Sequence, residues 1–513
     1  MAGKEQFEAA VRIIETLRAK GYEAYLAGGC VRDLLLGREP TDYDVATNAT
    51  PDVVLEMFPR TFAVGAHFGV VLVAGDCGES AGAKPVEVAT YRSDLAYSDG
   101  RHPDGVRYTQ TAEEDVRRRD FTINGLLLDP LCATWKEDDA ELSVRSEETT
   151  ADPSLRLPRI RFANAGPEPR SAQDDSSGGM PRELRGAVID YVGGVADLDA
   201  GLIRAIGRPE QRFEEDRLRM LRAVRFAARF GFEIEPETMR AIRTLAPRID
   251  AVSRERVRDE LTKMLTEGHA RRAFELLDET GLLAEVLPEI ARMKGVEQPP
   301  QYHPEGDVWV HTLMLLEQLE AGCSMTLAWG TLLHDVGKPP TFRRAEDRVR
   351  FDGHAEMGVA MGAEICRRFR FSNEEAQQIL ALIENHMRFM DVQRMKESTL
   401  KRFFRLERFD EHLALHRMDC MAGSGYLENW KYARERLSAM TEETVRPRPL
   451  ITGRELIAAG YKPGEGFREM LRVAEDAQLE GTVTTEEEAL KLVREKFPLK
   501  GLDSTADSRK EEG

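Results

Sequence analysis

Apolar residues change their spacing along this chain, and that change limits the fold more than any other feature. In the first 131 residues they form short β-branched runs at strand length, such as Val70–Val73 and Val86–Thr90, between segments with helical spacing. From Glu214 onward they recur at the 3.6-residue spacing of helices. The pattern predicts a multidomain α+β protein in which a small mixed sheet with flanking helices precedes an all-helical remainder.

Length and composition indicate several intracellular domains. A chain of 513 residues is too long for one hydrophobic core, so three or four domains are expected. We find neither a secretion signal nor an apolar run of about 18 to 20 residues, so we expect no membrane association. The six cysteines are scattered without a C-x-x-C pair, which favours reduced thiols in the cytoplasm over a disulfide framework or a zinc knuckle.

Two aspartates predict a metal-dependent phosphate site. Asp42 and Asp44 lie one residue apart in an expected strand, so their carboxylates face the same side and offer the hard oxygen ligands that Mg²⁺ prefers. The preceding Gly-Gly turn, which ends at Gly29, lets backbone N–H groups approach a triphosphate, and Arg32 adds a permanent positive charge. Glu87, on a neighbouring expected strand, is either a third metal carboxylate or an exposed strand residue.

A later segment has side chains suited to base recognition. Asp216, Arg219 and Arg222 follow one another at three-residue intervals, so a helix would place all three on one face. A carboxylate accepts from an exocyclic amine and a guanidinium donates to a ring nitrogen, a pair that cytosine and adenine satisfy and uracil and guanine do not. Asp216 and Arg219 are therefore predicted to select C and A, and Arg222 to bind the triphosphate. The alternative is a set of charges on a solvated helix.

The order of these segments resembles that of the class II tRNA nucleotidyltransferases, or CCA-adding enzymes, and of the related bacterial poly(A) polymerases. The resemblance runs from about Tyr22 to Leu261, apart from one poorly matched stretch, and returns in the C-terminal half. It implies template-independent addition of C and A from CTP and ATP to the 3′ end of tRNA by two-metal in-line attack. It also implies that Arg119 and Asp120 contact ribose, the alternative being an ion pair at a helix start. The segment Ser253–Arg256 resembles a motif that braces the helices of the neck.

Two further segments favour tRNA repair over polyadenylation. Residues Gly65–Gly69 match the Gly-x-x-Phe-Gly pattern of the tRNA enzymes, where the poly(A) polymerases have a basic segment. Residues Tyr97–Asp104 resemble the flexible loop used in switching from C to A, which disfavours a pure CC-adding enzyme. A poly(A) polymerase or an A-adding enzyme remains the first alternative.

The C-terminal half contains a second candidate metal site. Adjacent His and Asp ligands, with more imidazoles and a distant carboxylate supplied by other helices, suit a transition metal such as Ni²⁺, Co²⁺ or Mn²⁺ that activates water. The pattern resembles the HD superfamily of phosphohydrolases, and a degenerate site that only stiffens the body is the alternative. Lys338 is either a phosphate ligand or a surface residue that ends the turn. The predicted metal ligands are His311, His334, Asp335, His354, His386 and Asp419.

Net charge and local charge indicate different partners. A formal net charge of −18 argues against nucleic acid, whereas residues 217–258 contain 11 Arg and no Lys against five acidic residues. Because this basic stretch follows the proposed nucleotide site, we predict that it contacts tRNA. A metal phosphohydrolase with a regulatory nucleotide-binding head, and a non-catalytic RNA-binding head, are alternatives of other classes that the intact Asp42 and Asp44 disfavour. The sequence gives no indication of the oligomeric state.

The predicted domains follow from these patterns. Residues 132–181 are rich in acidic residues, Ser, Pro and Gly, a composition that buries too little apolar surface to offset the entropy of ordering, so a largely disordered insertion is expected there. The other predicted parts are a nucleotidyltransferase head at 1–131, a head–neck connection at 182–213, a helical neck at 214–295, an HD phosphohydrolase-like domain at 296–430, and a helical C-terminal module with a disordered tail at 431–513.

Overall fold

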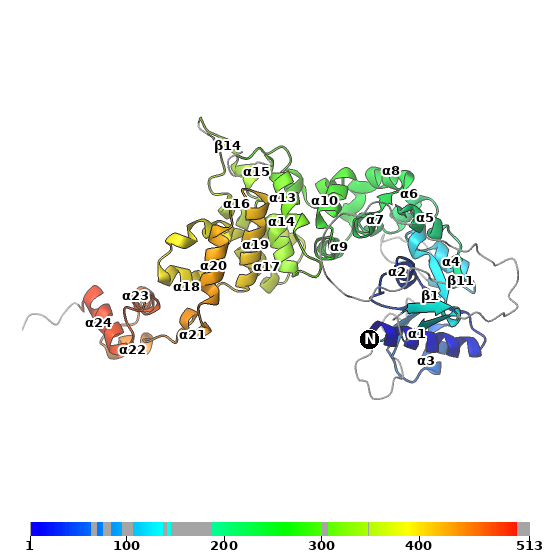
Figure 1. The fold of residues 1–513 in the computed structure, drawn as a ribbon, viewed down its shortest axis with the longest axis horizontal. Helices are drawn as coiled ribbons and strands as arrows, with labels where there is room; N and C mark the ends of the chain where they lie inside the picture. The colour runs from blue at the N-terminus through cyan, green and yellow to red at the C-terminus, as the bar shows by residue number, and fades with distance from the viewer. Residues whose placement is uncertain are drawn as a thin grey trace, which may run out of the picture. The chain divides into compact units, whose positions relative to one another are not determined.

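The chain divides into two compact units, Met1–Pro288 and Glu289–Gly513. The computed structural model describes residues 2–62, 69–74, 84–94, 106–136, 141–144, 187–299, 306–346 and 348–499 (Figure 1). Three predictions fall outside these residues: all but the last residue of the segment Gly65–Gly69, the loop Tyr97–Asp104, and the C-terminal tail.

The first unit is built on a seven-stranded mixed sheet with the order β11-β8-β1-β2-β5-β4-β3. The pair β2 and β5 is parallel, and the other neighbouring strands are antiparallel. The predicted small mixed sheet is therefore confirmed. Its strands are β1 (Ala24–Ala27), β2 (Asp44–Thr47), β3 (Thr61–Phe62), β4 (Val70–Val73), β5 (Val86–Thr90), β8 (Leu126–Asp129) and β11 (Ala187–Asp190).

Helices beside the sheet follow from apolar spacing and turn residues. The helix α1 (Ala2–Ala19) buries Ile14 and Leu17, and ends before Gly21, whose φ of 87° few other residues adopt. Directly after β1, α2 (Gly29–Leu35) begins at the predicted Gly-Gly turn. The other elements here are α3 (Pro51–Met57), α4 (Ala112–Arg117), the 3₁₀ turns η2 (Thr122–Asn124) and η3 (Pro130–Cys132), and the strand pair β6 (Arg92–Asp94) and β7 (Val106–Tyr108).

Part of the predicted disordered insertion is ordered. The strands β9 (Ala133–Lys136) and β10 (Glu141–Val144) pair as an antiparallel hairpin, with Trp135 opposite Leu142 in register. The composition argument averaged over residues 132–181 and so missed two short runs of strand-forming residues on either side of an acidic turn. The rest of the insertion lies outside the described residues.

Helices and two short strands complete the first unit. Phe226 on α7 contacts Phe121 of the sheet region edge to face, so α7 is anchored against the head. The two-residue strands β12 and β13 pair in parallel, and β13 corrects the expectation that residues from 214 onward are wholly helical. The elements are α5 (Gly194–Ala200), β12 (Leu202–Ile203), α6 (Pro209–Glu215), α7 (Leu218–Phe230), β13 (Glu233–Ile234), α8 (Pro236–Leu245), η5 (Ala246–Ala251), α9 (Arg254–Thr266), α10 (Ala270–Glu279) and α11 (Leu282–Val286).

The second unit is a helical body with one small hairpin. Trp329 is buried on α14, where it packs edge to face on Phe371. Beside these helices lies the antiparallel hairpin β14–β15, a second exception to the predicted all-helical pattern. The elements are α12 (Pro288–Ala291), α13 (Val308–Glu317), α14 (Met325–Leu333), α15 (Lys338–Thr341), β14 (Arg343–Arg344), β15 (Val349–Arg350), α16 (His354–Arg368), α17 (Asn373–Asn385), the 3₁₀ segment η6 (His386–Arg394), α18 (Glu397–Phe404) and α19 (Phe409–Ala422).

The last helices belong to two hydrophobic clusters. Ala433 of α20 (Glu428–Ser438) and Val445 of α21 (Glu442–Val445) pack with Phe403 of the preceding body. A separate cluster around Leu456 unites α22 (Gly453–Ala458), α23 (Gly466–Leu479) and α24 (Glu486–Lys496). Packing therefore begins the separate C-terminal module near residue 450. None of the helices described is both long and apolar enough to cross a bilayer.

A buried ion pair between α7 and α9 gives a stability prediction. Arg225 Nε lies 2.7 Å from Glu260 Oε2, and their side chains are 7% and 5% exposed. Replacing Arg225 by Ala removes the closest charged partner of the buried Glu260 carboxylate and leaves Lys263 at 3.9 Å, and breaking a buried pair in this way typically costs about 3–5 kcal/mol. We expect the α7 and α9 amides of Arg225→Ala to lose protection in hydrogen exchange by a corresponding amount. The matched control is Arg240→Ala, whose pair with Glu237 is exposed and should matter little; equal protection in both variants would contradict the prediction.

Candidate active sites

The first unit contains a cavity of about 690 Å³. Seven arginines and five acidic residues line it, so the cavity is strongly polar and favours a ligand with both phosphate and base groups. Every head residue selected from the sequence lies in this lining: Gly29, Arg32, Asp42, Asp44, Glu87, Arg119, Asp120, Asp216, Arg219 and Arg222.

Three carboxylates meet at one side of the cavity. Asp44 begins β2, and its register partner on the parallel strand β5 is Glu87. Burial, followed by the charge of Glu87, raises the pKa of Asp44 to about 6. Glu87 is exposed and also lines the cavity. It is therefore an exposed strand residue, one of the two alternatives, and it still lies where the other alternative, a third metal carboxylate, requires it. Asp42 is exposed too, with Lys84 3.3 Å away. The donor set of clustered carboxylate oxygens fits hard divalent cations.

The turn before α2 requires glycine. Gly28 has a φ of 75°, and a Cβ added there would lie 2.7 Å from Nη1 of Arg119. Arg119 is itself fixed by Asp115, whose Oδ2 lies 3.0 Å from Nη2. The turn therefore brings the backbone close to a guanidinium at the cavity wall.

Arg32 lies in the cavity lining, but its guanidinium is already engaged. It is 5% exposed, pairs with Asp33 at 2.7 Å, and donates to Asn124 Oδ1 at 2.5 Å. Its guanidinium carbon also lies 4.6 Å from the ring centroid of Phe230. Burial lowers the pKa of Arg32. The sequence argument missed Asn124, which also donates to Asp120 at 3.0 Å and so joins Arg32 to the third segment.

The expected single helical face of Asp216, Arg219 and Arg222 is wrong. Asp216 has extended backbone angles, with φ −141° and ψ 105°, and precedes α7. Its carboxylate accepts from the backbone N–H of Leu218 at 3.1 Å, which is how a short acidic side chain satisfies a helix start. All three residues nevertheless line the same cavity.

Each of these charged groups has an internal partner. Asp216 Oδ2 lies 2.8 Å from Arg256 Nη2, and Arg219 Nη1 lies 2.7 Å from Glu215 Oε2. The sequence assigned Arg256 to a bracing motif and missed this contact, because the two residues are 40 positions apart.

Arg222 and Asp120 form a third pair, with Nη2 and Oδ2 2.6 Å apart. Burial alone would raise the pKa of Asp120, but Arg222 and the hydrogen bond from Asn124 lower it to about 2. The sequence predicted that Arg222 binds the triphosphate and that Asp120 contacts ribose. In the structure the two side chains contact each other.

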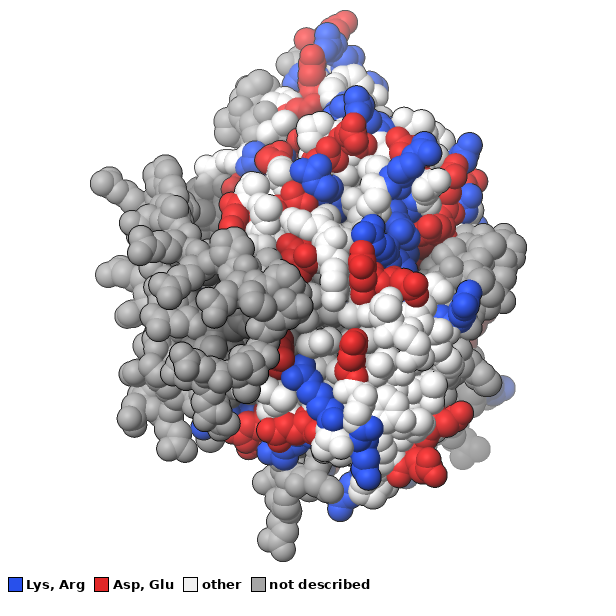
Figure 2. Space-filling model, turned by 90° about the vertical axis from the view of Figure 1, so that its right-hand side faces the viewer, with Lys and Arg blue, Asp and Glu red and all other residues white. Residues whose placement is uncertain are grey.

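Basic and acidic side chains also lie next to one another on the surface of the protein. On the face drawn in Figure 2, basic and acidic side chains alternate over the described residues. Within the basic stretch 217–258, Arg222, Arg225 and Arg256 pair with acidic residues and also line the cavity. Four of the eleven arginines of this stretch line the cavity, and its contact with tRNA stays a prediction.

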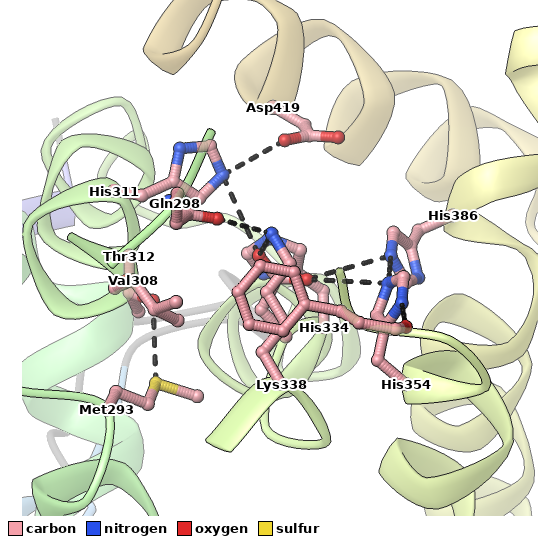
Figure 3. A network of polar contacts seen from close by, with 12 residues as sticks. Met293, Gln298, Val308, His311, Thr312, His334, Lys338, His354, His386 and Asp419 are labelled. Carbon is pink, nitrogen blue, oxygen red and sulfur yellow. Dashed lines mark hydrogen bonds and ion pairs between the residues drawn. The ribbon is translucent and has the colours of Figure 1, made fainter. Parts of the chain in front are cut away.

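The second unit brings all six predicted HD ligands together (Figure 3). They form two groups, His311, His334 and Asp419, and Asp335, His354 and His386, with the candidate ligand atoms of each group within 4.8 Å of one another. His311 Nε2 lies 3.0 Å from Asp419 Oδ1 and 3.9 Å from Asp335 Oδ2, so the groups adjoin.

Backbone carbonyls orient the imidazoles. The Nδ1 atoms of His334, His354 and His386 lie 2.8, 2.9 and 2.6 Å from carbonyl oxygens three residues earlier in the chain. Each Nδ1 must therefore carry the proton, which leaves an Nε2 lone pair directed at the centre. Burial lowers the pKa of His386 to about 4, so this ring is neutral at pH 7.

The directed lone pairs fit bound metal. His354 Nε2 and His386 Nε2 are 3.2 Å apart, and buried His334 Nε2 lies 3.1 Å from Asp335 Oδ2. A cation between such atoms would satisfy them, and a nitrogen and carboxylate donor set suits transition metals. Lys338 is 6% exposed, with Nζ 2.7 Å from Asp335 Oδ2 and 2.6 Å from Gln298 Oε1. The alternative that Lys338 is a surface residue is therefore wrong.

Comparisons with known families agree with this organisation. Residues 24–138 match the family model of the poly A polymerase head domain, residues 231–294 that of the probable RNA and SrmB-binding site of polymerase A, and residues 308–419 that of the HD domain. The three matches follow one another in the order head domain, RNA-binding region and HD domain, and each covers less than half of the chain.

Proteins similar to this chain include CCA-adding enzymes. The enzyme of Lactobacillus gasseri is 34% identical over 317 residues, which are 61% of this chain and 65% of that enzyme, slightly less than two thirds of its length. The Bacillus stearothermophilus CCA-adding enzyme, solved in complex with CTP, has a TM-score of 0.67 at 24% identity over 96% of this chain and 98% of that one. The Thermotoga maritima CCA-adding enzyme, solved with tRNA, has a TM-score of 0.53 at 17% identity over 95% of each chain. These two structures share the fold.

The raised pKa of Asp44 can be tested directly. Because the charge of Glu87 follows burial as the cause, Glu87→Gln should lower the pKa of Asp44 from about 6 toward its ordinary range without reaching it. A folded-state pKa above the unfolded value means that this group's stabilising contribution is present at low pH and is lost as pH rises through 6. Carboxyl ¹³C NMR titration of the metal-free protein measures the shift. Glu56→Gln, an acidic residue of α3 outside the cavity lining, is the control; equal Asp44 titration in both variants would exclude the Glu87 contribution.

Proposed function

We propose that this protein is a tRNA nucleotidyltransferase that adds C and A from CTP and ATP to the tRNA 3′ end. The observation that carries the proposal is a single cavity in which the carboxylates of Asp42 and Asp44 lie with the Asp216 and Arg219 side chains. One group suits phosphoryl transfer and the other suits recognition of a base. Similar proteins that match these parts of the chain are named CCA-adding enzymes.

The carboxylates define the reaction end of the cavity. Asp42 and Asp44, with Glu87 as a third donor, would hold Mg²⁺, which when bound lowers the charge on a triphosphate and activates the RNA 3′-hydroxyl. The backbone N–H of Gly29 would donate to a phosphate oxygen, whereas the N–H of Gly28 already donates to Leu126 O at 2.9 Å, and Arg119 adds positive charge beside that turn. The new bond joins the 3′-oxygen to the α-phosphorus, and pyrophosphate leaves.

Base choice falls to Asp216 and Arg219. A carboxylate oxygen has lone pairs to spare, so Asp216 can keep its contact with Arg256 while accepting from the amine of cytosine or adenine. Arg219 keeps its contact with Glu215 and has further N–H donors for the ring nitrogen. Uracil and guanine would oppose an acceptor with an acceptor, which costs about 1–3 kcal/mol per unsatisfied group. Arg222 and Asp120 act as a fixed pair that holds this helix against the head.

Location and partners follow from the same proposal. Cys30, Cys323, Cys366 and Cys420 form no disulfide, which supports a reducing cytoplasm as the place of action. The guanidinium-rich wall of the cavity supports binding of the phosphates of the nucleotide and of the tRNA end.

A second activity is favoured by the HD centre. The imidazoles of His334, His354 and His386 are each anchored at Nδ1 by a backbone carbonyl and lie in two adjoining groups of candidate ligands. We propose hydrolysis of a phosphate ester there. The six ligands would hold a transition metal such as Ni²⁺, Co²⁺ or Mn²⁺, which when bound supplies a hydroxide at neutral pH. Lys338 is placed to stabilise charge on the phosphate, and hydrolysis breaks one P–O ester bond.

The transfer proposal predicts the result of one assay. Purified protein given tRNA that ends before CCA should incorporate from CTP and then ATP, and should use UTP and GTP at least tenfold less well. Asp44→Asn should lower incorporation by at least a thousandfold, because the charge that holds the divalent cation is lost, while tRNA binding changes little. Filter binding measures the second quantity. The matched control is Asp52→Asn on α3; full activity in Asp44→Asn, or long A tracts in place of CCA, would contradict the proposal.

The hydrolase proposal predicts a reciprocal result. The double variant His334→Ala, Asp335→Ala should lose bound transition metal and at least 99% of hydrolysis of a 2′,3′-cyclic phosphate, yet retain CCA addition. Asp44→Asn should retain hydrolysis, so the two variants are controls for each other. Metal content by mass spectrometry and activity with Ni²⁺, Co²⁺ or Mn²⁺ are the measurements. If the wild-type protein cleaves no phosphate ester with any of these metals, the hydrolase proposal is wrong and the HD centre has only a structural role.

A further inference from the structure

A second cavity of the first unit, of about 320 Å³, lies where the sheet meets the helices that follow it. Among the described residues, none lines both this cavity and the nucleotide cavity. Three of its described lining residues are charged, and all three are arginines: Arg117 at the end of α4, Arg204 after β12 and Arg212 on α6. The uncharged lining residues are Thr122, Tyr191, Val192, Ala205, Ile206 and Gly207.

One wall of this cavity is fixed by hydrogen bonds between segments that are distant in the sequence. The N–H of Thr122 donates to Arg204 O at 3.0 Å, and the N–H of Ile206 donates to Asp120 O at 3.1 Å. Thr122 Oγ1 donates to Asp197 Oδ2 at 2.7 Å, and the same oxygen accepts from Arg204 Nε at 3.0 Å. A ligand that binds here therefore meets a wall that needs little ordering, which lowers the entropic cost of binding.

Two of the three guanidinium groups are only partly engaged by their acidic partners. Arg117 donates from Nε and Nη2 to Glu113 of its own helix, and its side chain is 61% exposed. Arg204 donates from Nε to Asp197, and its Nη1 lies 3.4 Å from Glu235 Oε1. Each side chain thus uses two of the five N–H donors of an arginine, which leaves three for a ligand. The carboxylates also reduce the repulsion among the three like charges.

Arg212 joins this cavity to the residue that is proposed to read the base. Its Nε donates to Ile206 O at 2.9 Å and its Nη2 donates to Arg117 O at 2.6 Å, so the side chain is held beside the cavity. Its Nη1 lies 2.8 Å from Glu215 Oε2, and the same oxygen lies 2.7 Å from Arg219 Nη1. One carboxylate oxygen is therefore shared by a lining residue of this cavity and by Arg219.

The side chains that line the cavity favour a phosphate group as the ligand. Guanidinium groups present paired N–H donors that match the oxygens of a phosphate, and three of them from three different elements can surround one such group. Tyr191 is 40% exposed at the same cavity, and burial raises the pKa of its phenol, so the hydroxyl stays protonated and can donate as well. The volume is at the lower end of the range of small-molecule sites.

We propose that Arg117, Arg204 and Arg212 form a binding site for a phosphate group, and that its occupancy changes base selection. A phosphate that accepts from Arg212 competes with Glu215 for that guanidinium. Glu215 is then left with Arg219 as its main partner, so the Arg219 side chain is held more rigidly and discriminates more sharply against UTP. The binding is independent of the transfer function proposed above, whereas its effect on base selection rests on that function.

Hydrogen exchange of the full-length, metal-free protein tests the binding without using catalysis. The probe is inorganic phosphate, compared with chloride at equal ionic strength. We expect exchange at residues 190–212 to slow about twofold at the half-saturating phosphate concentration, and not to slow in Arg117→Gln. This variant removes one guanidinium and keeps the backbone carbonyl that accepts from Arg212. The control is Arg367→Gln, an exposed arginine of the second unit that also pairs within its own helix.

The phosphate group has two sources, a free anion and the backbone of an RNA strand. A tRNA that ends before CCA is therefore the second probe in the same exchange experiment. Protection of residues 190–212 by this tRNA that is lost in Arg117→Gln identifies an RNA phosphate as the ligand, and protection by inorganic phosphate alone identifies a free anion. Absence of protection by both probes, or equal protection in Arg117→Gln, would overturn the site.

Incorporation from CTP and UTP in competition measures the effect on base selection. Phosphate bound in the nucleotide cavity excludes both nucleotides equally, so it does not change the ratio of their incorporation into tRNA that ends before CCA. We expect phosphate to raise the ratio of CTP to UTP incorporation about fivefold in the wild-type protein, a modest allosteric coupling, and to leave it constant in Arg117→Gln. A constant ratio in the wild-type protein would overturn the coupling. If the transfer proposal is wrong, neither nucleotide is incorporated although the protection persists, so the two failures differ.

Discussion

The ion pair between Asp120 and Arg222 connects the two parts of the nucleotide cavity. Asp120 follows α4 in the head and Arg222 lies on α7, and the charged atoms are 2.6 Å apart with side-chain exposures of 10% and 33%. Asn124 donates to the same carboxylate, and it also accepts from Arg32 beside the Gly-Gly turn. The helix that follows the Gly-Gly turn, the η2 segment and α7 are thereby linked by one set of polar contacts, beside the residues proposed to bind metal and base. In phosphoryl transfer the protein contributes little covalent chemistry and acts mainly by positioning the reacting groups. The proposed reaction would therefore depend on polar contacts that keep these elements in place.

The HD centre depends on a different constraint, in which the backbone orients the ligands. Three histidines donate from Nδ1 to a carbonyl three residues earlier, so local helical geometry selects the tautomer before any metal arrives. The two centres thus differ in chemistry: carboxylate oxygens of variable protonation in the first unit, and imidazole nitrogens of fixed tautomer in the second.

Features local to one element could be predicted from sequence, and features made by two elements could not. The strands Val70–Val73 and Val86–Thr90 coincide with prediction because β-branched runs bounded by turn residues carry their own signal. The residues that line the first cavity were identified because the order of their sequence motifs resembles that of known nucleotidyltransferases. Helical spacing alone misplaced Asp216, since its side chain caps α7 instead of continuing it. The partners Arg256 and Asn124 were missed because sequence spacing does not show which arginine reaches which carboxylate across the fold.

Charge distribution reconciles an acidic chain with the proposed RNA substrate. A formal net charge of −18 lowers the affinity of the surface as a whole for polyanions. The arginines are concentrated at the cavity, where seven stand against five acidic residues, three of which are the carboxylates placed to bind divalent cations. When those carboxylates are neutralised by cations, the remaining wall is strongly positive. Attraction for phosphate would then depend on the same ions that the chemistry requires, so affinity is restricted to the place where the 3′ end must react.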